Sequence, residues 1–116
     1  MCGICGFVGN GNKSILINMR EKMLHRGPDD AGIYLNLENQ IGLGHRRLSI
    51  IDLSERGRQP MESSSGENVI TYNGEVYNYR EIRDELKKLG YCFRTDTDTE
   101  VIEILYQHKG LDCLSN

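Results

Sequence analysis

The sequence predicts an α+β fold, and three observations support this prediction. Between residues 13 and 25, apolar side chains recur at every fourth position, which is the spacing of one face of a helix. The ranges 31–37 and 40–48 have the composition of strands, and the residues between them suit a β-hairpin. A Thr-x-x-Glu sequence begins at Thr97, and this pattern is typical of the first turn of a helix. Helices are therefore expected to alternate with antiparallel strands.

The remaining elements follow from local signals. In chain order, we expect a strand over 3–8, a helix over 13–25, strands over 31–37, 40–48 and 68–72, a helix over 79–89, a short strand over 91–94 and a helix over 97–109. Asn78 is placed to cap the second helix and Gly90 to end it. The range 52–67 contains two glycines and a proline, so we expect it to be mainly loop.

The composition is that of one soluble globular domain. Of 116 residues, 38% are hydrophobic and 27% are charged, and the net charge is −3. Lysine and arginine do not cluster along any segment that could follow a phosphate backbone, so we expect no nucleic-acid partner. No apolar run approaches the roughly 18 residues of a membrane span, and the N-terminus lacks the features of a secretion signal. We therefore expect a cytoplasmic protein that does not bind membranes.

The N-terminal stretch Met1-Cys2-Gly3-Ile4 carries the first candidate catalytic residue. Removal of Met1 would give Cys2 a free α-amine beside its thiol. An α-amine has an unperturbed pKa of roughly 7.7–8.0, so part of it is neutral near pH 7 and can accept the proton of the thiol. One residue would then supply both the nucleophile and the base.

The cysteines also allow a different class of protein. Cys2 and Cys5 have the spacing of a redox or zinc pair. A zinc site usually needs a second Cys/His pair of matching spacing, and none follows. A redox pair would begin a helix, whereas the glycine-rich sequence around Cys5 predicts a strand. We therefore expect reduced thiols and no metal site, and a redox or zinc protein remains the alternative.

The sequence Tyr72-Asn73-Gly74-Glu75 allows two interpretations. Asn-Gly between two apolar segments is a strong signal for a two-residue hairpin turn. The alternative is an oxyanion hole, in which the Asn73 side-chain amide and the Gly74 N–H point at one negatively charged oxygen. Glycine leaves that approach unobstructed, and loss of one such donor typically raises the barrier by roughly 2.7–4 kcal/mol.

Two charged segments complete the candidates. Arg46 and Arg47 lie near a strand end, where they form either a solvated pair or a guanidinium group that binds a carboxylate. The run 96–100 lacks the glycine and glutamate spacing of a calcium loop. Helix capping explains this run, and one of its carboxylates could also face a ligand ammonium.

Five stretches of the chain occur in an order that is specific to one family. They are Met1-Cys2-Gly3-Ile4, His25-Arg26-Gly27-Pro28-Asp29, Arg47-Leu48-Ser49-Ile50, Tyr72-Asn73-Gly74-Glu75-Val76-Tyr77-Asn78 and Thr95-Asp96-Thr97-Asp98-Thr99-Glu100. With them the sequence resembles the N-terminal glutaminase domain of glutamine-hydrolysing asparagine synthetases, a class II glutamine amidotransferase of the N-terminal nucleophile hydrolase superfamily. Other class II amidotransferases carry a Thr-Arg-Trp-Ala-Thr-His-Gly-like stretch at 45–51, so the asparagine synthetase branch is favoured.

The resemblance implies catalytic roles for three residues. Cys2 would attack the side-chain amide of glutamine and form a thioester, with its own α-amine as the base. Asn73 and Gly74 would form the oxyanion hole. Glutamate and ammonia would be the products. Retention of Met1 would leave an amide nitrogen at Cys2, and the chain would then be inactive.

The resemblance also implies a binding site for the free amino acid. Arg47 would bind the α-carboxylate of glutamine, whereas Asp98 and Glu75 would bind its α-ammonium. The backbone carbonyls of Leu48 and Ile50 would line the pocket.

The implied fold is an αββα sandwich, with two antiparallel sheets between layers of helices. This sandwich needs more strands than the sequence supplies, so we expect residues 1–116 to be an incomplete type 2 glutamine amidotransferase domain, truncated at its C-terminus. The glutaminase step needs no cofactor, whereas ATP and Mg belong to a synthetase domain that is absent here. Besides glutamine, the expected partner is that domain of the full-length chain, and a homodimer remains open. The alternatives are a non-catalytic glutamine- or partner-binding module and a glutaminase domain that serves a different amide acceptor.

Overall fold

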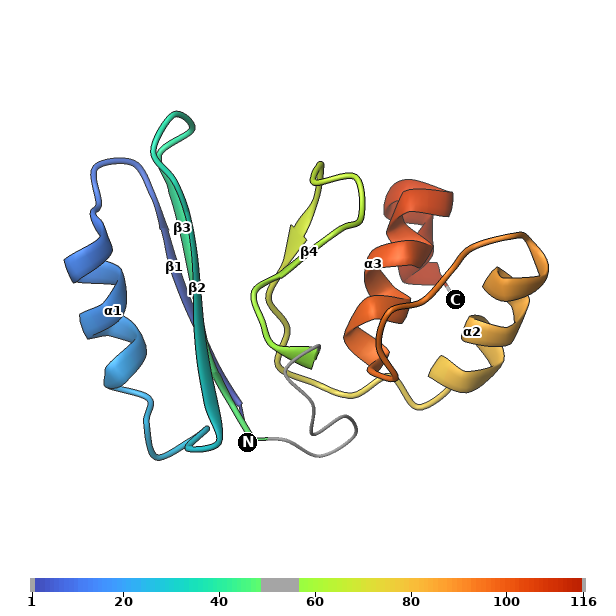
Figure 1. Ribbon diagram of the computed structural model, residues 1–116, viewed down its shortest axis with the longest axis horizontal. Coiled ribbons are helices and arrows are strands. Elements are labelled where there is room, and N and C mark those ends of the chain that lie inside the picture. Colours follow the sequence, from blue (N-terminus) through green and yellow to red (C-terminus); the bar gives the residue numbers. More distant parts are fainter. Residues whose placement is uncertain (1, 49–56, 116) are drawn as a thin grey trace.

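The computed structural model describes residues 2–48 and 57–115 of the chain (Figure 1). Its elements occur in the order β1 (Gly3–Val8), α1 (Lys13–Glu21), β2 (Asp30–Asn36), β3 (Ile41–Arg47), β4 (Met61–Glu62), β5 (Val69–Ile70), α2 (Tyr79–Lys88), α3 (Asp98–Lys109) and the 3-10 helix η2 (Gly110–Ser115). The pairs formed by these strands are antiparallel. The predicted α+β fold class is therefore confirmed.

Strands β1, β3 and β2 form a three-stranded sheet in that order. β2 and β3 are a hairpin in which Asn36 pairs with Ile41 and Asp30 pairs with Arg47. Gln40, in the turn, has a positive φ of 54°. The predicted hairpin is confirmed, and each strand end differs from the expectation by one residue.

Helix α1 covers one face of this sheet (Figure 1). Asn12 caps the helix, because its side-chain oxygen accepts a hydrogen bond from Ile15 N at 2.9 Å. Leu16 of α1 is completely buried. Gly44 of β3 leaves room for the neighbouring Cys5, since a Cβ atom there would lie 2.7 Å from Cys5 Sγ, whereas at 3.5 Å from Leu16 Cδ1 it would make an ordinary contact.

The helix ends at Glu21, so the predicted extension to His25 is wrong. The N–H groups of Met23, Leu24 and Arg26 bond to carbonyls three positions back, which makes turns instead of a further α-helical turn. The chain leaves the helix because the next segment returns to β3, where the Asp29 N–H donates to the Arg47 carbonyl at 3.0 Å.

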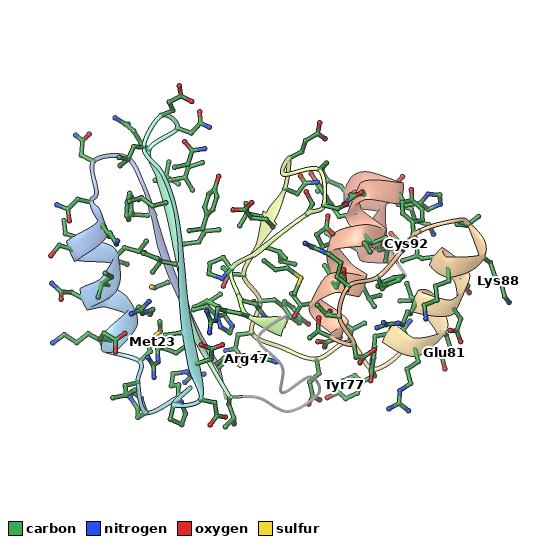
Figure 2. The ribbon with its side chains drawn as sticks, viewed as in Figure 1. Met23, Arg47, Tyr77, Glu81, Lys88 and Cys92 are labelled. Atoms are coloured by element: carbon green, nitrogen blue, oxygen red, sulfur yellow. The ribbon has the colours of Figure 1, made fainter. Side chains whose placement is uncertain are left out.

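The other face of the sheet is turned toward β4, β5 and α3, and α2 lies beyond α3 (Figure 1). Helices α2 and α3 pack through one core cluster, which consists of Ile82, Leu86, Val101, Ile104 and Leu105. Figure 2 shows Met23 on the α1 side of the sheet and Arg47 on the other side, with the exposed residues Glu81 and Lys88 on α2. Functional residues at the end of β3 therefore face the space between the sheet and α3.

The region before α2 differs from the expectation. The predicted strand over 68–72 is reduced to β5, and β5 pairs with β4, which lies in a range predicted to be loop. Residues 71–78 contain no strand, so Asn73-Gly74 is not the turn of a hairpin. Asn78 occupies the N-cap position of α2, but its side chain makes no capping hydrogen bond.

The predicted strand over 91–94 is also wrong. The backbone N–H groups of Arg94 and Thr95 donate to the carboxylate of Glu100, which is 1% exposed, instead of to a neighbouring strand. Thr97 caps α3 as expected, since its Oγ1 accepts from Glu100 N at 3.3 Å. The glutamate of this capping sequence reaches Arg94 and Thr95, so the reciprocal bond to Thr97 N is not formed.

Within residues 2–48 and 57–115, no helix has the length and apolar composition that crossing a bilayer requires.

Candidate active site

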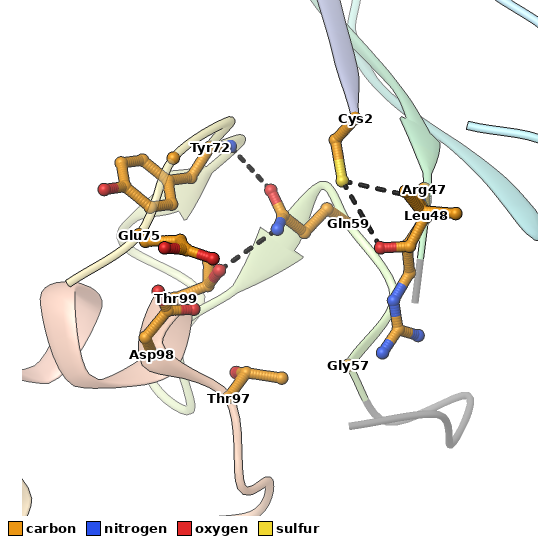
Figure 3. Close-up of a pocket in the computed structure, with 11 residues that line it drawn as sticks. Cys2, Arg47, Leu48, Gly57, Gln59, Tyr72, Glu75, Thr97, Asp98 and Thr99 are labelled. Carbon is orange, nitrogen blue, oxygen red and sulfur yellow. Dashed lines mark hydrogen bonds between the residues drawn. The ribbon is translucent and has the colours of Figure 1, made fainter. Parts of the chain in front are cut away.

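A cavity of about 80 Å³ lies where the start of β1, the end of β3, the segment after β5 and the first turn of α3 meet (Figure 3). These elements bring together residues that are up to 97 positions apart in the sequence. The lining residues are Cys2, Arg47, Leu48, Gly57, Gln59, Tyr72, Gly74, Glu75, Thr97, Asp98 and Thr99.

Cys2 directly precedes β1, and its thiol faces this cavity (Figure 3). Its Sγ accepts a hydrogen bond from Leu48 N at 3.4 Å and donates to the Leu48 carbonyl at 3.7 Å. The Arg26 Nε donates to the Cys2 carbonyl oxygen at 3.0 Å. Both sides of Cys2, the thiol and the backbone, therefore have fixed partners.

Cys5 does not join Cys2 at this site. Its thiol lies on the α1 side of the sheet, close to Gly44 and Arg20. Burial raises the pKa of the Cys5 thiol, and the Arg20 charge offsets part of this shift. The structure therefore separates the two thiols of the CxxC pair, and Cys5 is half-buried. Within the two described ranges, no three His, Cys, Asp or Glu residues are grouped so that they could hold a metal ion.

Arg47 and Asp98 approach the cavity from opposite sides (Figure 3). Arg47 is the last residue of β3 and is 6% exposed. Gly57 lies close to it, since a Cβ atom at Gly57 would be 2.6 Å from Arg47 Nη2. Asp98 begins α3 and is also 6% exposed. Its Oδ2 accepts a hydrogen bond from Val76 N at 3.0 Å. The second candidate acid, Glu75, lines the cavity and is exposed.

The structure treats the two proposed oxyanion-hole residues differently. Gly74 lines the cavity, whereas Asn73 is exposed and does not. A Cβ at Gly74 would lie 2.7 Å from the hydroxyl oxygen of Tyr72, so only glycine fits there without a shift. Leu48 lines the cavity beside Cys2, and Ile50 lies outside the described residues.

Gln59 and His45 were not among the residues predicted for the site. The Gln59 side chain lines the cavity and bonds to Tyr72 N and Thr99 Oγ1. His45 is completely buried on β3, and its Nε2 lies 3.2 Å from the Tyr72 carbonyl oxygen. Burial lowers the pKa of His45, the nearby Arg47 charge lowers it further, and the hydrogen bond with Tyr72 opposes both. No local motif marks either residue, because their partners are distant in the sequence.

A thiol, a guanidinium group and two carboxylates around one small cavity are complementary to a zwitterionic small molecule that carries a reactive carbonyl group. Comparison with known proteins identifies the class. The family model described as "Glutamine amidotransferase domain" matches residues 1–116. The chain belongs to this family.

The chain is also similar to individual named proteins. The "Putative asparagine synthetase [glutamine-hydrolyzing] 2" of Methanocaldococcus jannaschii is 43% identical over 133 residues, which cover 98% of this chain and 25% of that protein. The "Asparagine synthetase [glutamine-hydrolyzing] 1" of Bacillus subtilis is 43% identical over 115 residues, which cover 90% of this chain and 18% of that protein. The "Amidase chry2" of Gibberella zeae is 36% identical over 134 residues, which cover 100% of this chain and 19% of that protein. The chain therefore spans a quarter or less of the length of these relatives.

Proposed function

We propose that this chain hydrolyses the side-chain amide of glutamine to glutamate and ammonia, as the glutaminase domain of an asparagine synthetase. One observation carries the proposal: Cys2, Arg47, Gly74 and Asp98 face the same cavity in a chain that the amidotransferase family matches throughout. The names of the two most identical relatives described above both include glutamine hydrolysis.

The charges around the cavity suit a free amino acid. The Arg47 guanidinium would bind the α-carboxylate, and its planar fork offers two parallel donors. Asp98 would bind the α-ammonium from the opposite side, with Glu75 contributing a second negative charge. The carbonyls of Leu48 and Ile50 would line the pocket. The glutamine side chain would then extend from this pair of anchors toward the Cys2 thiol.

The chemistry proceeds through a thioester. With Met1 removed, the α-amine of Cys2 accepts the thiol proton, and the thiolate attacks the carboxamide carbon. The resulting oxyanion accepts hydrogen bonds from the Gly74 N–H and from the Asn73 side chain, once that side chain turns toward the cavity. The C–N bond breaks, and the α-ammonium returns its proton to the leaving nitrogen, which departs as ammonia. A water molecule, deprotonated by the α-amine, attacks the thioester; the C–S bond breaks and glutamate and the thiol are released.

Several further features belong to this proposal. The layers described above, with α1 on one side of the sheet and β4, β5, α3 and α2 on the other, support an αββα sandwich. The glutaminase step uses only groups of this chain and needs no cofactor. The ammonia would serve an ATP- and Mg-dependent synthetase domain that amidates aspartate, since the relatives are several times longer and two of them are named asparagine synthetases. The similarity to an amidase keeps a different amide acceptor as the second candidate.

The test is glutamate release from glutamine by the purified protein, compared with Cys2→Ala. Intact mass and N-terminal sequencing of the same sample establish whether Met1 is absent. We expect steady release by the processed protein, and release near zero for Cys2→Ala and for protein that retains Met1. Equal release by the processed protein and Cys2→Ala would refute the proposal. Glutamine that stabilises the fold without being hydrolysed would favour a binding module instead.

A further inference from the structure

We propose that Gln59 is a positioning residue for the oxyanion hole: its side-chain amide fixes the backbone of Tyr72 against the first turn of α3. This inference rests on the proposed glutaminase activity and adds a residue to it. We call the Gln59 side chain and its two hydrogen bonds, to Tyr72 N and Thr99 Oγ1, the Gln59 bridge.

The Gln59 bridge spans two walls of the cavity (Figure 3). Gln59 Oε1 accepts from Tyr72 N at 2.6 Å, and Gln59 Nε2 donates to Thr99 Oγ1 at 3.1 Å. A backbone N–H can only donate, so the oxygen of the amide must face Tyr72 and its NH2 group must face Thr99. At 8% exposure the side chain is nearly excluded from water, so neither bond is easily replaced by solvent.

The backbone of Gln59 packs closely against Gly32 of β2. A Cβ atom at Gly32 would lie 2.1 Å from the Gln59 carbonyl oxygen and 3.3 Å from Pro60 Cδ. Glycine at this position of β2 therefore lets the Gln59–Pro60 segment lie directly against the three-stranded sheet. Contact with the sheet therefore positions the backbone that carries the Gln59 side-chain amide.

Tyr72 is the residue through which Gln59 would act on the reaction. Its N–H donates to Gln59, and its carbonyl lies 3.2 Å from His45 Nε2. Two buried side chains thus bind both polar backbone groups of Tyr72, the residue directly before the proposed oxyanion donors Asn73 and Gly74. Oxyanion donors are effective only when they are oriented before the charge develops, and the Gln59 bridge supplies that orientation.

Substrate binding should depend much less on Gln59. Asp98 is the first residue of α3, and its carboxylate is fixed separately by Val76 N at 3.0 Å. Arg47 belongs to β3, on the opposite wall. Loss of the Gln59 bridge should therefore lower kcat and leave KM for glutamine nearly unchanged, whereas general loosening of the site would alter both.

The experiment measures kcat and KM for glutamate release by the purified wild-type protein, Gln59→Met and Thr99→Val. Methionine is close to glutamine in size but makes neither bond, and valine removes only the Thr99 hydroxyl. For Gln59→Met we expect kcat to fall about 10- to 100-fold, since displacing reacting groups by about 1 Å costs roughly 10²-fold, with KM within about twofold. For Thr99→Val the same pattern should be smaller. Ser63→Ala is the matched control. It removes a hydrogen bond that Asn68 N donates to the buried Ser63 Oγ at 3.1 Å, beside β4 and away from the cavity.

The outcomes separate this proposal from the activity on which it rests. A wild-type protein that lacks Met1 and releases no glutamate would refute the proposed function. If wild type releases glutamate normally and Gln59→Met has the same kcat as Ser63→Ala, the role of Gln59 is overturned and the proposed function is not. A higher KM of Gln59→Met with unchanged kcat would overturn that role as well. If the circular dichroism spectrum shows that Gln59→Met does not fold, Thr99→Val is the deciding variant. A kcat of Thr99→Val equal to that of wild type overturns the proposal, and a severalfold lower kcat at constant KM supports it.

Discussion

The Nε atom of Arg26 donates a hydrogen bond to the carbonyl oxygen of Cys2 at 3.0 Å. Three residues further along, the Asp29 N–H donates to the carbonyl of Arg47 at 3.0 Å. The short segment 26–29 after α1 therefore contacts both the proposed nucleophile and the proposed carboxylate-binding arginine. It therefore holds the residue before β1 and the last residue of β3 at the end of the sheet where the cavity lies.

Replacement of Arg26 by methionine should reduce glutaminase turnover. The stem of the side chain is retained, but the Cys2 carbonyl loses this donor, so the backbone that carries the thiol is held less firmly relative to Gly74. We expect kcat to fall about tenfold or more, since reactions at enclosed sites are sensitive to small displacements, as measured by glutamate release. Arg80→Met on α2, an exposed position outside the cavity, is the control. Equal kcat values for the two variants would contradict the prediction.

Replacement of Gly27 by alanine should destabilise the protein. A Cβ atom there would lie 2.4 Å from the Arg46 carbonyl carbon and 2.5 Å from Arg47 N, so the backbone of β3 would have to move. Forcing extra atoms into a packed site typically costs about 1–3 kcal/mol. Urea denaturation followed by circular dichroism measures this loss, with Ser64→Ala at an exposed turn position as the control. A change in the free energy of unfolding below about 0.5 kcal/mol would be evidence against the close contact.

The sequence predicts those elements whose signals lie within a few positions of each other. The β2–β3 hairpin and helices α2 and α3 are examples, because turn residues, caps and apolar spacing are all local there. Strand β4 was missed because it exists only through pairing of Met61 with Ile70 and Glu62 with Val69. The range 91–94 has strand-like composition, but a carboxylate several positions later binds its N–H groups.

Residues of the site could be predicted to the extent that the family resemblance marks them. Cys2, Arg47 and Asp98 have no spacing that brings them together, and the resemblance alone indicated that they meet. Gln59 and His45 carry no such mark. Their bonds to Tyr72 span 13 and 27 positions. The Gln59 bond lies beside the β4–β5 pair, and the His45 bond joins β3 to the segment after β5, so both depend on the tertiary structure.

Leu16 and Ile15 offer a matched test of how α1 is attached to the sheet. Leu16 is fully buried, whereas Ile15, its neighbour, is 45% exposed. Leu16→Ala should lower the free energy of unfolding by about 2–5 kcal/mol, through lost apolar burial and the cavity left behind. Ile15→Ala should cost clearly less, because much of its side chain already contacts water. Urea denaturation of both variants checks the prediction, and equal losses would show that α1 does not pack on the sheet through Leu16.

His45 should make stability depend on pH in a window below its ordinary pKa. Burial and the Arg47 charge lower the pKa of the folded state, although Tyr72 and Asp30 act in the opposite direction. As pH falls below about 6.5, the unfolded chain binds a proton at His45 before the folded chain does. The free energy of unfolding therefore decreases toward acidic pH, by at most about 1.4 kcal/mol per pH unit for one proton, and the contribution is fully present above the unfolded pKa.

His45→Gln tests this assignment, because glutamine can still donate to the Tyr72 carbonyl but does not titrate. We expect the free energy of unfolding of wild type, minus that of the variant, to decrease steadily from pH 7.5 to pH 5.5 in urea titrations. His25 and His108 are present in both proteins, so their contributions cancel in the difference. A difference that stays constant over this range would mean that His45 takes up its proton equally well in the folded and unfolded states. Because His45 Nε2 must carry hydrogen to donate to Tyr72, its protonation at Nδ1 would place a charge beside Arg47.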